Sequence, residues 1–345
     1  MIVRNPGAGP STIRAVAQAT DALRAARSLL VRPVRPVAVG LTLRWVPRSR
    51  AAVLMYHRVA DRPFDPWRLA VAPDRFEEHM EVVRRHFRPI SLSALADGLE
   101  RGVVPTRAVA VTFDDGYKDN LYAGKPVLER HEIPGTVFVT SGYVDSGRSF
   151  WWDELERITF APRRPTDGRL HIEELDADWS LPSDELYLAL WEQLHLLTAA
   201  QRLETMGRIA ETAGVSSDDD PNTMTESELH RLADGGLVEI GAHTVTHPSL
   251  IGLPRASQLE EIRESRLHLE ALLGRPVASF CFPHGKFSDE SVSCVVEGGY
   301  AQSCISNPGV VRRGVSRFEL PRLRTINWYG DVFAWELAKF FRRDD

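Results

Sequence analysis

The chain has few cysteines and no long apolar run. Only three cysteines occur among its 345 residues, at positions 281, 294 and 304, and no two of them have CxxC spacing. A set this small and odd excludes a disulfide framework and fits a reducing compartment. Arginines interrupt the N-terminal segment throughout, so neither a secretory signal nor a membrane-spanning helix of about 20 residues is expected. We therefore predict a cytoplasmic protein.

Charge is distributed unevenly along the chain. Residues 1–50 hold nine arginines and one aspartate, so residues 51–345 carry a formal charge of −13 against a total of −5. Apolar residues three or four apart over 11–30 predict an amphipathic helix. A basic helix of this kind can lie on an anionic membrane surface, be a solvated arm, or pack on its own domain. We therefore predict a basic, partly helical N-terminal arm over 1–50, for which peripheral contact with a membrane is one of the three alternatives. The net negative charge of the whole chain argues against a nucleic-acid partner.

Residues 51–345 show the alternation typical of an α/β domain. Short apolar runs predict strands, and helical patterns follow most of them, which indicates βαβ units in a parallel sheet or barrel. Ser257 and Glu260 indicate a capping box for one helix. Residues 147–235 interrupt the alternation with tryptophans and helix-like segments, so a mostly helical insertion is expected there. The expected strands are 52–56, 109–113, 136–140, 237–242 and 277–282, and the expected helices are 73–87, 121–131, 257–273 and 288–298.

Two acidic residues end one of these strands. The motif Thr-Phe-Asp-Asp-Gly at 112–116 places Asp114 and Asp115 at the carboxyl end of a parallel strand, where α/β folds form active sites. Adjacent carboxylates point in different directions, so one can bind a cation while the other acts as a base. Taken alone, the motif is better explained as an ordinary turn, since Asp-Gly is a common turn pair.

A pair of histidines follows another expected strand. His-Thr-Val-Thr-His at 243–247 has histidines four apart, which would lie on one side of a helical turn and could reach one ion. An isolated pair is more simply two surface histidines. With Asp115, however, His243 and His247 make a three-ligand set with open positions, the pattern of a catalytic metal site.

Three further residues at strand ends are candidates. His57 follows the first expected strand. It can face the same end of the sheet as the acidic pair, or it can be a core histidine. His284, in a Pro-His-Gly turn, can present its backbone N–H to a substrate oxygen, or the turn can be a plain one. Arg322, in Leu-Pro-Arg, can pair with a carboxylate, the alternative being a surface salt bridge.

The order Thr-Phe-Asp-Asp-Gly, His-Thr-x-x-His, Phe-x-Phe-Pro-x-Gly resembles the polysaccharide deacetylases of the NodB-homology class (carbohydrate esterase family four), from residue 52 to residue 328. The resemblance implies a distorted (β/α) barrel with a divalent metal, usually zinc, and hydrolysis of an N-acetyl group from an amino sugar. It also implies roles for six residues: Asp114 as general base, Asp115, His243 and His247 as metal ligands, Arg322 as the arginine that orients the base, and the backbone N–H of His284 as oxyanion donor.

Three features depart from the family pattern. The family often has tyrosine where His284 stands. The late Leu-x-His motif that supplies the general acid is not found, whereas the early Tyr-His segment at 56–57 resembles the circularly permuted branch that includes poly-N-acetylglucosamine deacetylases, so His57 is the expected acid. The long interval between Asp115 and His243 is explained by the insertion, in which Trp151 and Trp152 are expected either to stack on a sugar or to pack in a core.

These observations favour a zinc-dependent N-deacetylase of an amino sugar that is part of a polymer or linked to a lipid or nucleotide. Two other classes stay open: a metal hydrolase of a non-sugar amide or cyclic imide, and a non-catalytic carbohydrate-binding protein on a degenerate barrel. A thiol hydrolase using Cys281 is a remote alternative, because this mid-strand cysteine is expected to pack as a small apolar residue.

Overall fold

The structure of the protein is a computed structural model that describes residues 49–172, 175–216 and 220–342. The helix expected over 11–30, and the membrane contact expected for the N-terminal arm, fall on residues outside these ranges. Among the described residues, none of the helices combines the length and the apolar character that crossing a membrane requires.

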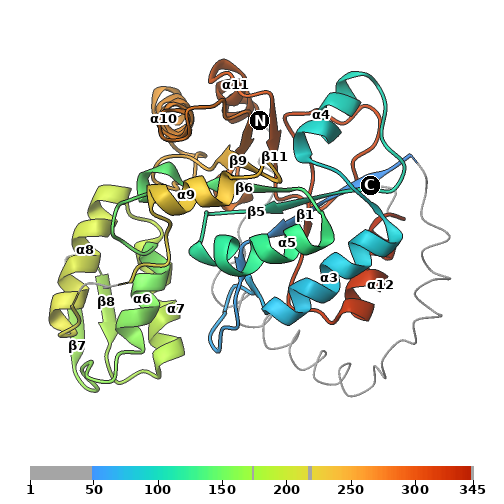
Figure 1. The fold of residues 1–345 in the computed structure, drawn as a ribbon. Coiled ribbons are helices and arrows are strands. Elements are labelled where there is room, and N and C mark those ends of the chain that lie inside the picture. Colours follow the sequence, from blue (N-terminus) through green and yellow to red (C-terminus); the bar gives the residue numbers. More distant parts are fainter. Residues whose placement is uncertain (1–48, 173–174, 217–219, 343–345) are drawn as a thin grey trace.

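A curled parallel sheet forms the centre of the molecule (Figure 1). Its strands lie in the order β11-β10-β9-β6-β5-β1-β12, and β4 pairs with β5 beside this path. An isolated parallel bridge between Cys304 and Leu320 joins the β11 edge to the segment that leads into β12, so the sheet curls toward closure. The expected distorted (β/α) barrel is confirmed. The strands are β1 (Ala51–Tyr56), β4 (Arg88–Pro89), β5 (Ala108–Phe113), β6 (Gly135–Val139), β9 (Val238–Ala242), β10 (Ser279–Cys281), β11 (Gln302–Cys304) and β12 (Leu323–Arg324).

Helices lie around the outside of this sheet, and α10 packs on α11 while α12 packs on α3 (Figure 1). A two-stranded ribbon, β2 (Arg58–Val59) with β3 (Ala70–Val71), follows β1. Short helical turns occupy Asn120–Gly124, Ser141–Tyr143 and Pro283–Gly285. The helices are α3 (Pro73–His86), α4 (Leu92–Glu100), α5 (Lys125–His131), α9 (Glu226–Ala233), α10 (Arg255–Leu273), α11 (Asp289–Glu297) and α12 (Gly330–Phe340).

Most expected elements begin and end within three residues of the observed ones, but the capping box at Ser257 is wrong. The helix α10 begins earlier, at Arg255, and its N-cap is Pro254, with no side-chain capping bond. Proline fixes φ near the helical value and suits a helix start. The segment 253–255 therefore starts the helix before Ser257. The helix expected over 121–131 also differs, since a π turn at Asn120–Gly124 precedes α5.

The stretch between β6 and β9 contains a group of elements at one side of the sheet, at the lower left in Figure 1. These elements bury their own apolar cluster, which includes Leu155, Leu190 and Ile209. The antiparallel hairpin β7–β8 is an addition to the helices that the sequence predicts. The elements are α6 (Trp151–Thr159), β7 (Arg169–Ile172), β8 (Leu175–Asp178), α7 (Ser183–Leu194) and α8 (Ala199–Thr212).

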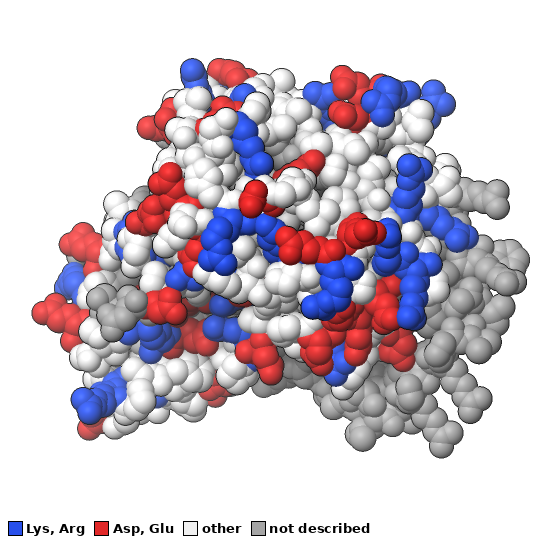
Figure 2. Space-filling view, in the orientation of Figure 1, with Lys and Arg blue, Asp and Glu red and all other residues white. Residues whose placement is uncertain are grey.

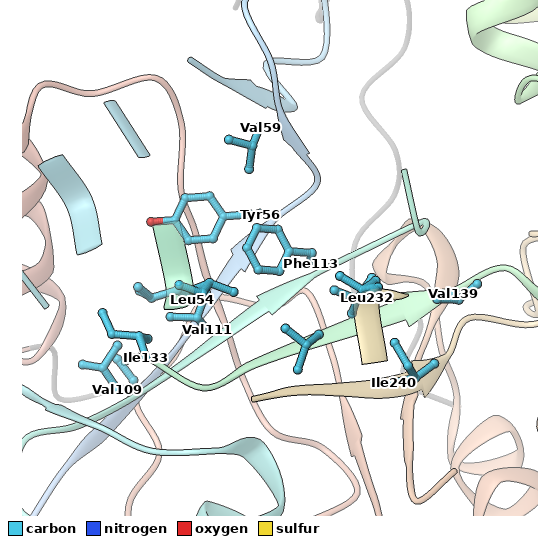
Figure 3. Packing of buried hydrophobic residues seen from close by; sticks show 14 of the residues in the cluster. Leu54, Tyr56, Val59, Val109, Val111, Phe113, Ile133, Val139, Leu232 and Ile240 are labelled. Atoms are coloured by element: carbon cyan, nitrogen blue, oxygen red, sulfur yellow. The ribbon is translucent and has the colours of Figure 1, made fainter. Parts of the chain in front are cut away.

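The main core lies beneath the sheet strands, and β1 and β5 are buried along their whole length. Figure 3 shows Leu54, Tyr56, Val111 and Phe113 packed side by side on these two strands. The rings of Tyr56 and Phe113 lie 5.5 Å apart. Burial on both faces is expected of parallel strands, and it makes the carboxyl ends of β1 and β5 rigid supports for the residues that follow them.

On the face shown in Figure 2, acidic and basic side chains alternate over α3 and α5. Several of them pair: Arg84 lies 2.6 Å from Glu132, and Arg130 and His131 both contact Glu77. Exposed pairs of this kind contribute little to stability, about 0–1 kcal/mol each.

Candidate active site

The turn after β5 separates two neighbouring carboxylates. The N–H of Asp114 donates to Tyr56 O at 3.0 Å, which continues the pairing of β5 with β1. Asp115 then has a φ of 75° and Gly116 a φ of 86°. Left-handed backbone is uncommon for a residue other than glycine. The turn is held by Thr140, whose N–H donates to Asp115 O at 3.2 Å, and it directs Asp114 and Asp115 toward different partners.

Arg322 pairs with Asp114 through both ends of its guanidinium. Nη1 donates to Oδ1 and Nη2 to Oδ2, each at 2.7 Å, and both side chains are buried. Nε of Arg322 donates to Ile305 O at 3.0 Å, which fixes the guanidinium plane. Burial alone would raise the pKa of Asp114, but the adjacent guanidinium outweighs it and holds that pKa well below its ordinary value. Asp114 is therefore an ionised carboxylate at neutral pH.

Asp115, His243 and His247 converge at the same end of the sheet. Asp115 Oδ1 lies 3.6 Å from His243 Nε2 and 3.3 Å from His247 Nε2. One ligand atom from each residue lies within 4.8 Å of the other two, and all three residues are buried. Burial lowers the pKa of His243 to about 4 and that of His247 to about 3, so both imidazoles are neutral at pH 7.

The donor set of these three residues fits a divalent metal. His243 Nδ1 lies 2.7 Å from Cys281 O, and because a carbonyl oxygen only accepts, Nδ1 carries the proton and Nε2 presents a lone pair toward Asp115. A lone pair and a carboxylate oxygen repel each other unless a proton or a metal ion lies between them, and burial raises the pKa of Asp115. Two imidazoles and one carboxylate are ligands that zinc accepts, with at least one position left open.

The segment that carries the two histidines is a loop, so the predicted helical turn is wrong. Thr244 has a φ of 65° and His247 a φ of 58°. Glu261 of α10 holds this loop: its Oε2 accepts the N–H groups of Val245 at 2.8 Å and Thr246 at 2.9 Å, and its Oε1 accepts the Thr246 hydroxyl at 2.6 Å. The role of Glu261 could not be predicted from the sequence, because nothing local marks which acid of a helix faces a distant loop.

A glycine supports the same loop from the other side. Gly142 donates its N–H to Val245 O at 3.0 Å, and Ser141 donates to Thr244 O at 3.0 Å. A Cβ atom at Gly142 would lie 2.6 Å from Val245 O. The close approach of these two backbones therefore requires glycine.

His57 and His284 both reach the cavity that contains the carboxylates. His57 Nε2 lies 3.9 Å from Asp114 Oδ2, and burial lowers the pKa of His57. His284 has a φ of 57°, and its ring lies 4.6 Å from that of His247 in an edge-to-face arrangement. The structure thus brings together the seven candidates Asp114, Asp115, His243, His247, His57, His284 and Arg322.

The cavity has a volume of about 320 Å³ and an aromatic wall. Trp151 and Trp152 line it as expected, and the ring of Trp152 lies 5.1 Å from that of His247. Trp151 is buried and also belongs to the apolar cluster of the insertion, as the packing interpretation expects, and stacking on a sugar stays a prediction. Trp67 and Trp191, whose rings lie 4.4 Å apart, belong to the same wall. The sequence did not indicate them as site residues, because they come from distant segments without a shared motif.

Cys281 is a buried thiol beside the Asp114–Arg322 ion pair. Arg322 Nη2 donates to its Sγ at 2.9 Å, and Sγ lies 3.8 Å from Asp114 Oδ2. Burial raises the pKa of Cys281 well above its ordinary value. A thiol held in its neutral form is a poor nucleophile, which argues against the thiol-hydrolase alternative.

The fold and the site together define a class: hydrolases with buried carboxylates and imidazoles at the carboxyl ends of the strands of a curled parallel sheet. The family model for polysaccharide deacetylase matches residues 101–162 and 200–303. Over these residues the chain is similar to the polysaccharide deacetylase family. Members of this family deacetylate glycans and act on amide carbon–nitrogen bonds, so the chain is a hydrolase of this kind. His57 and Arg322 lie outside the matched residues.

Individual relatives agree with this family. YxkH of Bacillus subtilis (strain 168), whose name assigns it to the polysaccharide deacetylases, is 21% identical over 288 residues, which cover 82% of this chain and 75% of YxkH. The crystal structure of BC0361, a polysaccharide deacetylase from Bacillus cereus, is 18% identical with a TM-score of 0.56, and the match covers 84% of this chain and 69% of that one. The structure of IcaB from Ammonifex degensii is 17% identical with a TM-score of 0.55, covering 86% of this chain and 98% of that one.

Proposed function

We propose that this glycan deacetylase removes the N-acetyl group of an amino sugar and requires a divalent metal, zinc, to do so. One observation carries the proposal: the Asp115–His243–His247 set and the Asp114–Arg322 pair open into one cavity. A cation-binding group and an ionised carboxylate held side by side are what hydrolysis of an unreactive amide needs.

Asp115, His243 and His247 are the residues that would hold the metal. When bound, a divalent metal supplies Lewis-acid chemistry and makes water more acidic. The tautomer of His243, set by its bond to Cys281 O, leaves a lone pair for this purpose. The Glu261 contacts keep His243 and His247 facing Asp115.

Asp114 acts as the general base. Its carboxylate is ionised, because the pKa is held low by Arg322, and it accepts a proton from the attacking water. The water oxygen bonds to the acetyl carbon, and the backbone N–H of His284 would stabilise the negative oxygen that forms. The carbon–nitrogen bond then breaks, releasing acetate and a free amine.

His57 delivers a proton to the leaving amine. Its Nε2 lies 3.9 Å from Asp114 Oδ2, so the proton accepted by the carboxylate lies one short transfer from the imidazole. Burial keeps the imidazole neutral beforehand, and it can therefore accept this proton. A positioned acid or base of this kind accelerates the reaction by about 10²–10⁴-fold.

The aromatic wall would contact the sugar itself. Trp152 lies closest to the metal ligands, through His247, and its Nε1 is anchored by the Tyr117 hydroxyl at 2.7 Å. An anchored ring is a rigid surface for the apolar face of a pyranose. Trp152→Ala should therefore raise KM for the glycan with little change in melting temperature. A melting temperature that falls while KM holds would instead show a packing role.

The test combines metal content with product release. The purified full chain, supplied with zinc, should contain about one zinc per chain by elemental mass spectrometry. It should also release acetate from N-acetylglucosamine oligomers, and His247→Ala should lose both metal and activity. A chain that binds no metal after zinc is supplied, or that releases acetate at full rate after chelation, would overturn the metal-dependent mechanism. Activity restored to a higher level by cobalt or nickel would correct the identity of the ion.

A further inference from the structure

A second cavity lies on the other side of Trp151 from the catalytic one. It has a volume of about 500 Å³, within the range of small-molecule sites. Trp151 lines both cavities, so the two are neighbours that share a wall. The helix α8 supplies most of the apolar lining, through Leu203, Met206 and Ala210, and the side chain of Leu203 is 55% exposed.

Two guanidinium groups line this second cavity, and neither has a carboxylate within ion-pair distance among the residues that the structure describes. Arg202 donates only to the carbonyls of Leu194, at 3.0 Å, and Leu197, at 2.7 Å, and its guanidinium lies 4.8 Å from the centre of the Trp151 ring. Arg148 is exposed at the rim. Burial beside the apolar wall lowers the pKa of Arg202, as expected for a cation without a counter-ion.

The acidic residue of the lining does not neutralise these cations. Glu154 is paired with Arg157, whose Nε donates to it at 2.9 Å. The lining is therefore apolar with a net positive charge. Such a surface is complementary to an apolar chain that ends in an anion.

The second cavity also contacts the loop of the metal ligands. Val245 and Thr246 line it, whereas His243 and His247 on either side of them line the catalytic cavity. A molecule bound there would lie against the back of the loop that holds both imidazoles.

We propose that this second cavity binds an alkyl or prenyl chain that carries a phosphate group, with the chain against Leu203 and Met206 and the phosphate at Arg148 and Arg202. This binding is separate from the proposed deacetylation and is measured without turnover. The same chemistry has two sources: a carrier attached to the sugar substrate, or a separate lipid phosphate.

The probe is octyl phosphate below its micelle concentration, titrated into the zinc-supplied full chain by calorimetry. One molecule should bind per chain, roughly tenfold or more tighter than inorganic phosphate or octyl glucoside, because only octyl phosphate satisfies both the apolar wall and the cations. Equal affinity for octyl phosphate and octyl glucoside, or no saturable binding, would overturn the proposal.

Gly207 offers a position at which a larger side chain can be introduced into the lining of the cavity. It lines the cavity on α8, and a Cβ atom there would meet no atom within 4 Å. Leucine also favours a helix more than glycine does. Gly207→Leu should weaken octyl phosphate binding roughly tenfold, and Arg148→Gln roughly fivefold. The matched control Arg208→Gln, an exposed residue of the same helix outside the lining, should stay within about twofold.

Two further arms distinguish the sources and the alternatives. The first arm compares KM for N-acetylglucosaminyl octyl diphosphate with KM for an unlinked N-acetylglucosamine oligomer. A lower KM for the diphosphate in the wild type, but not in Gly207→Leu, shows that the bound alkyl chain is part of the substrate. Equal KM values assign the site to a separate ligand. Binding to phosphatidylglycerol vesicles that Gly207→Leu leaves unchanged, without binding of octyl phosphate, would overturn the cavity site in favour of a surface. Octyl phosphate binding without any acetate release would retain the site and reject the deacetylase proposal.

Discussion

Arg322 and Asp114 lie 208 positions apart in the chain, yet two hydrogen bonds of 2.7 Å join the guanidinium to both oxygens of the carboxylate. The pair is buried, and it sets the ionisation state and the orientation of the proposed base. Replacing only one member leaves the other as an uncompensated buried charge, which costs about 3–5 kcal/mol.

Arg322→Gln should lower the free energy of unfolding by about 3–5 kcal/mol. It should also move the acid limb of the kcat/KM profile to higher pH. The sign follows from the depressed pKa of Asp114: its ionised form contributes stability above the unfolded pKa of about 3.9, and this is lost as pH falls through the lower folded value. Without Arg322, burial raises that pKa instead. Arg322→Lys should recover part of the activity but not the bidentate geometry. An acid limb at the wild-type position in Arg322→Gln would contradict the role of the pair.

Asp114→Asn should retain the metal and lose about 10²–10⁴-fold in kcat, because the amide cannot accept the proton from water. Elemental analysis and acetate release measured on the same sample separate the two effects. Full turnover by Asp114→Asn would show that another group is the base.

Glu261→Gln should weaken metal binding about 10–100-fold, because one amide oxygen cannot replace a carboxylate that accepts from two backbone N–H groups and a hydroxyl. Competition with a chelator gives the affinity. The neighbouring exposed residue of α10 provides the control, and Glu260→Gln should be unchanged. Equal metal affinity in the two variants would exclude a positioning role for Glu261.

Gly142→Ala should displace the metal-ligand loop, since the new Cβ atom would lie 2.6 Å from Val245 O. We expect a lower melting temperature together with weaker zinc binding. Gly207→Ala is the matched control: its Cβ meets nothing, and alanine should raise helix stability by about 1 kcal/mol. If Gly142→Ala binds zinc normally, the loop tolerates the displacement.

His79 should make stability depend on pH at a site remote from the metal ligands. It is fully buried, Nε2 lies 2.8 Å from Trp328 O, Nδ1 lies 3.1 Å from the Tyr56 hydroxyl, and burial lowers its pKa to about 3. A depressed histidine pKa contributes stability that is present above the unfolded value of about 6.5 and is lost as pH falls toward about 3. The slope from this one residue is at most about 1.4 kcal/mol per pH unit. Denaturant unfolding at several pH values should show a shallower slope in His79→Gln, and identical slopes would reject this source.

Local patterns predicted much of the architecture. Strands and helices along β1, β5, β6 and β9 follow from apolar periodicity, because a parallel strand buried on both faces is a continuous apolar run. The positions of the acidic pair and of His243 at strand ends follow as well, since the chain must turn where a strand stops. The helix start at Arg255 did not follow from the Ser257 pattern, because Pro254 takes the N-cap position and the helix begins two residues before Ser257.

The sequence by itself determined which chemistry-bearing residues follow each strand, and which family their motifs resemble. The family resemblance already implied that Arg322 orients Asp114, whereas only the tertiary structure decided that Glu261 holds the histidine loop and that Trp67 and Trp191 build one wall. These contacts join segments far apart in the chain, and no local periodicity records which distant side chain will fill a given space. The left-handed backbone at Thr244 and His247 was equally hidden, because it is imposed by neighbouring elements rather than by the residues themselves.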